Sequence, residues 1–224
     1  MAKRTDGEYC IKKETSFAFF IGTTKLKKIE NIISKTDNFL YKFFGSDKSV
    51  KPLQNIHEAE KIFSCLNQDG KEENVRVVGG CVRKALCGDE IDDLDLATSL
   101  EPIEAKKRLA KEDVKVIDTG ISHGTITAIL NDKKFEITTL RKDISTDGRH
   151  AEVEFTSNWE NDASRRDFTI NAIYSDLEGR IFDPLNGISD LQNGIIKFIG
   201  SPEERIKEDY LRILRYFRFF VQYS

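Results

Sequence analysis

Short apolar segments rich in β-branched residues recur along the middle of the chain and are separated by Gly, Asn and Asp. Segments of this kind are typical of β-strands bounded by turns. Asn131-Asp132 lies between two of them and predicts a tight turn. The pattern predicts strands at residues 75–78, 94–97, 114–117, 124–130, 134–140 and 195–199.

Other segments place apolar residues at helical spacing. They predict helices at residues 52–66, 82–86, 102–110, 161–173 and 202–223. Gly88 closes the second of these, and the polar segment 141–158 is predicted to be a loop. Strands mixed with helices predict an α/β (α+β) fold with a mixed sheet, followed by a helical region at the C-terminal end.

Composition sets limits on this picture. The chain has 224 residues, of which 39% are hydrophobic and 33% charged, so it has enough apolar material for a core. The densest apolar segment is only five residues long, which argues against a membrane span and a secretory signal. The net charge of −3 does not by itself indicate a nucleic-acid-binding protein.

The distribution of charge indicates a boundary in the chain, and the cysteines indicate its compartment. Residues 1–50 carry ten Lys and Arg against six Asp and Glu, whereas the rest of the chain is acidic, so we expect an N-terminal extension of unknown role to end near residue 50. The four cysteines form no CxxC pair and the three histidines are scattered, which argues against a zinc site. Reduced thiols predict a reducing compartment, and we expect a cytoplasmic protein.

Asp93 and Asp95 flank Leu94 in one predicted strand. Residues two apart in a strand point to the same face, so both carboxylates are expected on one polar surface. Two adjacent carboxylates repel each other, and a divalent cation such as Mg²⁺ relieves the repulsion. The alternative is a solvated acidic strand end.

Gly79-Gly80 precedes the predicted helix 82–86, thirteen residues before Asp93. Glycines at a strand–helix turn allow the backbone amides to approach a phosphate group, and Arg83 adds a charged donor one turn later. Alone, a Gly-Gly pair indicates only a tight turn. In this order and spacing, the glycines, the arginine and the carboxylates predict a polyphosphate next to a metal.

Two further groups of charged residues follow. Arg165 and Arg166 are consecutive in the predicted helix 161–173, so one is expected to reach the phosphates, and Asp167 is expected to support an arginine. In the last helix, charged residues lie opposite the apolar side: Asp209, Arg212, Arg215 and Arg218. Asp209 and Arg212 form either a salt bridge or a donor–acceptor pair for the edge of a nucleobase.

These motifs, in this order, resemble the class II tRNA nucleotidyltransferases (CCA-adding enzymes) and the related bacterial poly(A) polymerases. The resemblance covers residues 52–222 and rests on Val78–Arg83, Asp93–Thr98, Arg165–Ala172 and Glu208–Arg212. Segments 119–127 and 135–141 are also similar to that family. The resemblance implies a polymerase-β-like nucleotidyltransferase head at residues 51–175 and the first part of a helical neck at residues 176–224.

The resemblance also implies a role for each matching residue. Asp93 and Asp95 would be catalytic and bind Mg²⁺, and Glu136 would be a third catalytic carboxylate. Segment 143–155 would be the flexible loop that takes part in the change from C to A addition. The residues implied to bind the nucleotide are Gly79, Gly80, Arg83, Arg166, Asp209, Arg212, Arg215 and Arg218.

The activity implied is template-independent addition of C and A from CTP and ATP to the 3′ end of tRNA. The head motifs barely separate this activity from that of a poly(A) polymerase or an A-adding enzyme. Lys84 stands where the family usually has Asp, which favours a third alternative, a nucleotide- or RNA-binding remnant without turnover. Most of the neck, the body and the tail lie outside this sequence, so a second chain that supplies them is an expected partner.

Overall fold

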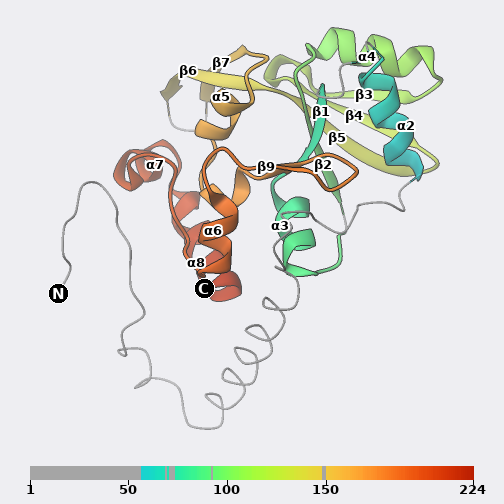
Figure 1. Ribbon diagram of the computed structural model, residues 1–224. Helices are drawn as coiled ribbons and strands as arrows, with labels where there is room; N and C mark the ends of the chain where they lie inside the picture. Colours follow the sequence, from blue (N-terminus) through green and yellow to red (C-terminus); the bar gives the residue numbers. More distant parts are fainter. Residues whose placement is uncertain (1–56, 69, 71–73, 92, 148–149) are drawn as a thin grey trace, which may run out of the picture. The chain divides into compact units, whose positions relative to one another are not determined.

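The computed structural model describes residues 57–68, 70, 74–91, 93–147 and 150–224 (Figure 1). They belong to the second of two units into which the chain divides, Ser49–Ser224. The predicted extension at residues 1–50 and the start of the predicted helix 52–66 lie outside the described residues. Among the described helices, none is both long and apolar enough to cross a membrane.

A seven-stranded mixed sheet forms the centre of the fold, in the order β3-β4-β5-β2-β1-β8-β9. Strands β2 and β5 are parallel, and every other neighbouring pair is antiparallel. The mixed α/β class predicted from the sequence is confirmed. The strands are β1 (Val75–Val78), β2 (Leu94–Thr98), β3 (Lys115–Gly120), β4 (Thr125–Leu130), β5 (Lys133–Thr139), β8 (Tyr174–Ser175) and β9 (Ile181–Phe182).

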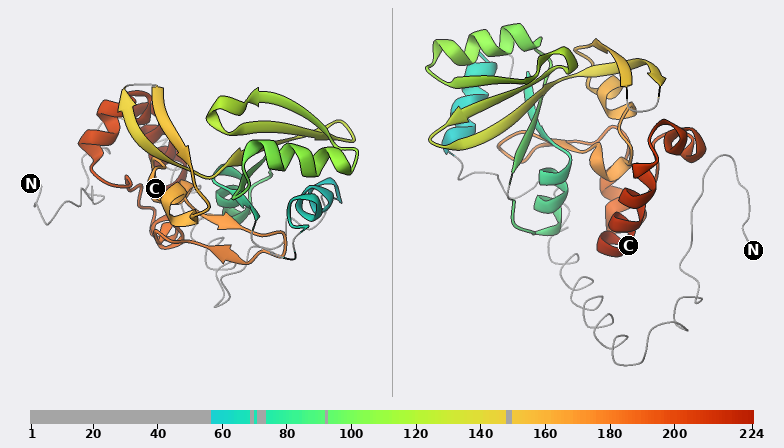
Figure 2. Two further views of the ribbon diagram at one scale, coloured as in Figure 1. Left: turned by 90° about the horizontal axis from the view of Figure 1, so that it is seen from above. Right: turned by 180° about the vertical axis from the view of Figure 1, so that it is seen from behind.

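Helices α2 (His57–Leu66) and α4 (Pro102–Lys111) pack against each other on one face of the sheet (Figure 2). Helix α3 (Gly80–Cys87) follows β1 directly and ends at Gly88, whose left-handed conformation (φ 72°) lets its amide reach the carbonyl of Ala85. The predicted turn between β4 and β5 is confirmed, because Asn131 and Asp132 both have positive φ.

Several predicted elements are wrong in type or extent. The predicted loop at 141–158 contains a hairpin, β6 (Arg141–Asp147) and β7 (His150–Phe155). The predicted helix 161–173 is only α5 (Trp159–Ser164), followed by the 3₁₀ turn η2 (Thr169–Asn171). The predicted strand at 195–199 reduces to one isolated bridge between Phe198 and Phe168.

The predicted helix 202–223 consists of two helices, α7 (Pro202–Glu208) and α8 (Leu211–Tyr223). The chain is extended at Asp209 (φ −154°, ψ 109°), which interrupts the helical hydrogen bonding. The side chain of Asp209 then accepts a hydrogen bond of 3.0 Å from the amide of Leu211 and so caps the start of α8. A short helix that the sequence did not predict, α6 (Gly187–Gln192), precedes them.

Aromatic contacts hold α8 against η2. The ring of Phe168 lies 5.6 Å from that of Phe219 and 4.5 Å from that of Phe198. Phe219 is buried, whereas the predicted apolar side of α8 is exposed in the described part of the chain. The exposed fractions are 84% for Val221, 66% for Leu214 and 59% for Phe217. The arginine-bearing side of α8 therefore faces the rest of the fold.

Candidate functional site

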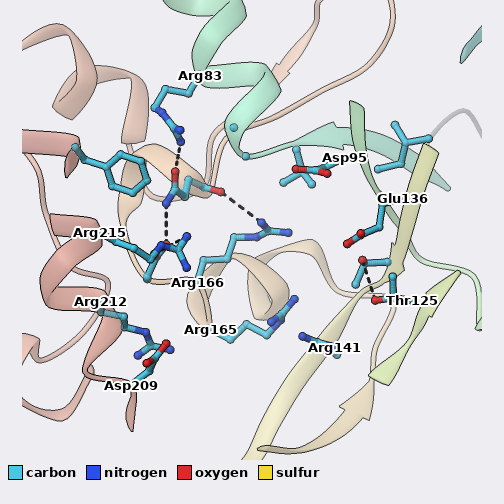
Figure 3. Close-up of a pocket in the computed structure, with 18 of the residues that line it drawn as sticks. Arg83, Asp95, Thr125, Glu136, Arg141, Arg165, Arg166, Asp209, Arg212 and Arg215 are labelled. Carbon is cyan, nitrogen blue, oxygen red and sulfur yellow. Dashed lines mark hydrogen bonds and ion pairs between the residues drawn. The ribbon is translucent and has the colours of Figure 1, made fainter. Parts of the chain in front are cut away.

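A cavity of about 500 Å³ lies between the sheet, η2 and α8 (Figure 3). It collects ten of the eleven residues to which the resemblance assigns a catalytic or nucleotide-binding role, Asp93 being the exception. Its lining residues are Val78, Gly79, Gly80, Arg83, Asp95, Leu96, Thr125, Glu136, Thr138, Arg141, Arg165, Arg166, Asp167, Asn171, Asp209, Arg212, Arg215, Arg218 and Phe219.

Two carboxylates lie on one wall of this cavity. Asp95 on β2 is paired in register with Glu136 on β5, so the two side chains leave the same face of the sheet next to each other. Asp93 precedes β2 and is exposed, as Asp95 is, whereas Leu94 between them is buried. The predicted alternation of polar and apolar positions is therefore confirmed.

The electrostatic environment of Asp95 makes its ionised form costly. Although Asp95 is exposed by surface area, the cavity wall partly shields its carboxyl from water, which raises its pKa above the usual value, and the charges of Glu136 and Asp93 raise it further. The guanidinium of Arg166 acts in the opposite direction and only partly offsets these effects. The repulsion between the carboxylates therefore outweighs the attraction of Arg166.

The residues present at this wall fit a divalent cation. Mg²⁺ is usually held by one or two carboxylates together with water and substrate phosphates, rather than by a cage of protein ligands. Asp95 and Glu136 supply such a pair. In the described part of the chain, no group of three or more His, Cys, Asp or Glu side chains surrounds one metal position.

The glycine turn forms the neighbouring wall. Gly79 has a φ of 73°, a left-handed conformation that side chains rarely adopt, and α3 begins at the next residue. A Cβ at Gly79 would lie 3.6 Å from the carbonyl oxygen of Asn171 and 3.7 Å from Nη1 of Arg166. The amide of Gly79 donates to the carbonyl of Ile173 at 3.1 Å, and both glycines line the cavity next to Arg166.

Arg83 connects this turn to α8. It donates a short hydrogen bond to Oδ1 of Asn171, and its guanidinium lies over the rings of Phe219 and Tyr223 at 4.6 and 5.0 Å. Its Nε is buried without a hydrogen-bond partner among the described residues. Lys84, the next residue of α3, is not one of the described residues that line the cavity. The contacts with Asn171 and with the rings of α8 set the orientation of Arg83.

Arg165 and Arg166 were predicted to lie within one helix, but they follow α5, which ends at Ser164. One of them was expected to reach the phosphates; both line the cavity, and both pair with Asp162. Asp167 was expected to support an arginine. It does so by an ion pair of 2.9 Å with Arg215 of α8, while its other oxygen accepts from Asn171 at 2.8 Å.

The predicted base-reading residues lie at the start of α8. Arg212 pairs with Glu208 and donates to the carbonyl of Arg205 at 2.9 Å, instead of forming a salt bridge with Asp209. Figure 3 shows Asp209 and Arg212 side by side at the edge of the cavity. The two side chains are thus held by different partners, Asp209 by the amide of Leu211 and Arg212 by Glu208.

Sequence reasoning missed several lining residues. Thr125 and Thr138 face each other across β4 and β5 with their hydroxyl oxygens 3.2 Å apart. Phe219 was not considered, and Arg141 ended the similar segment 135–141 without an assigned role. Thr125 and Thr138 lie near Asp95 and Glu136 because β5 pairs with both β2 and β4. This pairing joins distant segments of the chain, so no local sequence pattern predicts it.

Comparison with known proteins agrees with this site. The family model described as the poly A polymerase head domain matches residues 75–197, more than half of the chain. The chain belongs to this family. The matched segment contains the glycine turn, both carboxylates of the cavity wall and the Arg165-Arg166 pair.

Named relatives of this head domain are tRNA-processing enzymes. The chain is 51% identical over 183 residues to the mitochondrial CCA tRNA nucleotidyltransferase 1 of Danio rerio, and 49% identical over 151 residues to that of Homo sapiens. The aligned segments cover 77% and 67% of this chain, but only 42% and 35% of the relatives. The chain thus spans less than half the length of the curated relatives it matches.

Solved structures show the same head fold. A CCA-adding enzyme of Bacillus stearothermophilus in complex with CTP matches 72% of this chain and 38% of its own, with 39% identity and a TM-score of 0.63. A tRNA nucleotidyltransferase complexed with a primer tRNA and an incoming ATP analog matches 69% of this chain and 44% of its own, with 33% identity and a TM-score of 0.54.

Proposed function

We propose that this chain is the catalytic head of a template-independent RNA nucleotidyltransferase that adds C and A from CTP and ATP to the 3′ end of tRNA. One observation carries the proposal: the Asp95–Glu136 pair, the Gly79-Gly80 turn and the arginines of α8 all line a single cavity. Relatives named CCA-adding enzymes, one of them solved with CTP, support the substrate class.

The reaction needs no protein nucleophile. The 3′-hydroxyl oxygen of the RNA attacks the α-phosphorus of the bound nucleotide, forms the new phosphodiester bond and loses its proton to solvent. The bond between the α-phosphorus and the oxygen that bridges to the β-phosphate breaks, and pyrophosphate leaves with that oxygen. The amide of Gly80 at the start of α3 and the guanidinium groups of Arg165 and Arg166 bind the polyphosphate. Their positive charge stabilises the charge that develops on the leaving group.

Enzymes of this class generally use divalent metal ions, and we propose Mg²⁺ for this chain. Asp95 and Glu136 would hold it, and Asp93 stays a predicted ligand from just outside the cavity. A bound divalent cation lowers the pKa of an attacking hydroxyl and neutralises charge at the reacting phosphate. The raised pKa of Asp95 supports this assignment, because a cation would relieve the repulsion that causes it.

Base selection is assigned to the start of α8. Arg212 can donate to the acceptor edge of a base, and Asp209 can accept from an exocyclic amino group, which both cytosine and adenine carry. Arg215 and Arg218, which line the same cavity, add positive charge for the triphosphate or the RNA. A protein side-chain template of this kind reads an unpaired RNA end without a nucleic-acid template.

A second candidate is a poly(A) polymerase or an A-adding enzyme. The name of the matching family model favours it, since that model describes the poly A polymerase head domain. The cavity contents are the same for both activities. The discriminating property is the use of CTP, because only CCA addition incorporates CMP.

The test is an addition assay with tRNA that lacks its 3′ CCA, Mg²⁺ and labelled CTP alone, ATP alone or both. Because the relatives are more than twice as long as the matched segment, the assay is run with the chain alone and with the C-terminal helical part of a relative supplied in trans. CCA addition predicts CMP incorporation with CTP alone. Incorporation of AMP only would support the second candidate, and Mg²⁺-dependent nucleotide binding without pyrophosphate release would indicate a remnant without turnover.

The compartment follows from the sequence alone. We retain the prediction of a cytoplasmic location, which rests on the unpaired cysteines; Cys65, Cys81 and Cys87 are free thiols in the structure. The relatives from Homo sapiens and Danio rerio are named as mitochondrial. Microscopy of a fluorescently tagged chain distinguishes the two locations.

A further inference from the structure

One buried carboxylate outside the cavity lining binds both arginines of the Arg165-Arg166 pair. Asp162, in the last turn of α5, is 1% exposed. Its Oδ1 accepts from Nε of Arg165 at 2.8 Å, and its Oδ2 accepts from Nη2 and Nε of Arg166 at 2.9 and 3.2 Å. Each carboxylate oxygen therefore serves a different guanidinium group.

A third group holds this carboxylate in place. Tyr174, a fully buried residue of β8, donates its hydroxyl to Oδ2 of Asp162 at 2.8 Å. Nε of Arg166 also lies 3.1 Å from the same hydroxyl oxygen, and the Arg166 guanidinium lies 5.2 Å from the centre of the Tyr174 ring. Asp162 is thus fixed from the sheet as well as from its own helix.

The charge balance keeps Asp162 ionised. Burial disfavours its charged form, but the positive charges of Arg166 and Arg165 outweigh burial and hold its pKa below the usual value. One negative charge is therefore shared by two positive charges, which leaves one net positive charge at this point. Because both guanidinium groups line the cavity, that charge is presented to whatever the cavity binds.

The geometry also fixes the direction of each arginine. With Nε and Nη2 of Arg166 engaged by Asp162, its remaining nitrogen, Nη1, is turned to the glycine turn, 3.5 Å from the carbonyl oxygen of Asn171. Figure 3 shows the Arg166 side chain pointing towards Asp95 and Glu136, and that of Arg165 pointing towards Arg141. The shared anchor brings two consecutive arginines to one cavity although α5 ends before them.

We propose that Asp162 is a positioning residue that orients Arg165 and Arg166 towards the polyphosphate of the nucleotide. The inference rests on the proposed function and adds a residue that touches neither nucleotide nor metal. Its contribution acts through the two guanidinium groups. It therefore depends on the number of phosphates in the ligand and is independent of the base.

Asp162→Asn tests this role with nearly unchanged side-chain volume. Asparagine keeps one acceptor oxygen but replaces the other with an NH₂ donor. Four donor groups surround the native carboxylate, on Arg165, Arg166 and Tyr174, so the new amide must face at least one of them donor to donor. At least one arginine then loses its anchor.

The measurement is equilibrium binding of CTP, ATP and CMP to the full chain with Mg²⁺ present, with circular dichroism to verify the fold. We expect the Kd for CTP and for ATP to rise about tenfold in Asp162→Asn, while the Kd for CMP changes less than about twofold. A defect in general structure would weaken all three ligands equally. Glu160→Gln, which removes an exposed charge from the same helix, is the matched control and should bind all three as the wild type does.

A double substitution separates positioning from an independent effect. If Asp162 acts through Arg166, then Asp162→Asn combined with Arg166→Gln should bind CTP no more weakly than Arg166→Gln does alone. Additive losses would overturn the proposal, as would an equal loss for CMP and CTP. If Asp162→Asn does not fold, Arg166→Lys takes its place. It keeps the charge but gives up the paired contact, and an unchanged Kd for CTP would overturn the proposal.

Different results would overturn the proposed function and the role of Asp162. Absence of CTP binding by the wild-type chain overturns the proposed function together with this role. Wild-type affinity of a folded Asp162→Asn variant for CTP overturns only the role of Asp162 and leaves the proposed function intact.

Discussion

Asp95 and Glu136 lie opposite each other on the parallel strands β2 and β5, so their carboxylates share one face of the sheet. Burial and the neighbouring carboxylates raise the pKa of Asp95. A folded protein in this state binds more protons than the unfolded chain at pH values between the ordinary and the raised pKa. Its stability therefore falls as the pH rises through that window, and the ionised pair costs stability at neutral pH.

The first prediction concerns the Asp95→Asn variant. We expect nucleotide addition to fall by at least about a hundredfold, since even outer-shell changes at metal sites cost about tenfold to a hundredfold. In the absence of divalent cations the same variant should have a higher Tm than the wild type at pH 7, because a repelled charge is removed. The gain should vanish once the pH is below the ordinary pKa of Asp.

Mg²⁺ provides the control for this variant. It should raise the Tm of the wild type but not that of Asp95→Asn, because binding to the native state stabilises it. Glu90→Gln removes an exposed acid from the segment just before β2 and should behave as the wild type in both assays. Equal Mg²⁺ stabilisation of Asp95→Asn and the wild type would count against Asp95 as a ligand.

A second prediction concerns the origin of the raised pKa of Asp95. Glu136→Gln should lower this pKa more than Asp93→Asn does, because Glu136 contributes the larger repulsion of the two. The titration of the Asp95 carboxyl carbon followed by NMR in the absence of metal measures both shifts. A larger effect of Asp93→Asn would mean that the carboxylate just outside β2 is the nearer neighbour.

A third prediction addresses base selection. Arg212→Ala should reduce the preference for CTP over UTP in kcat/KM by about tenfold, the order expected for loss of a base-edge donor pair. Glu208→Gln should change the preference in the same direction but less, because Glu208 holds Arg212 in place. Lys207→Ala, at an exposed neighbouring position paired with Glu203, is the control. Unchanged discrimination in Arg212→Ala would remove α8 from the role of template.

A fourth prediction concerns the packing that supports the cavity. A Cβ at Gly187 of α6 would lie 2.2 Å from the carbonyl oxygen of Thr169 in η2. Gly187→Ala should therefore destabilise the fold by about 3 kcal/mol, or roughly 6–12 °C in Tm. Gly80→Ala introduces a Cβ whose nearest neighbour is a flexible arginine end at 3.9 Å and should not lower the Tm. Calorimetry of both variants measures the difference.

Local sequence patterns predicted the central strands well because each is a short apolar segment bounded by a turn. The hairpin β6–β7 was missed although Asp147, the last residue of β6, is followed in the sequence by Gly148, and Asp-Gly is a pair typical of hairpin turns. Its polar residues made the segment look like a loop. Alternation, not polarity, was the informative property there.

The break between α7 and α8 shows a different limit. The apolar spacing continues through residues 202–223, so periodicity alone predicts one helix. The signal that was present is Asp209, whose side chain caps α8 at the amide of Leu211. The pairing of β2 with β5, which sets Glu136 beside Asp95, joins segments about forty residues apart and depends on tertiary structure.

The most direct test of the account is the position of a bound metal and nucleotide. Crystals of the full chain grown with CTP and Mn²⁺ allow the metal to be located by its anomalous scattering. We predict a peak within coordination distance of the carboxylates of Asp95 and Glu136, with the triphosphate at the Gly79-Gly80 turn, next to the amide of Gly80. A triphosphate bound elsewhere, or one bound at the glycine turn with no metal at these carboxylates, would contradict it.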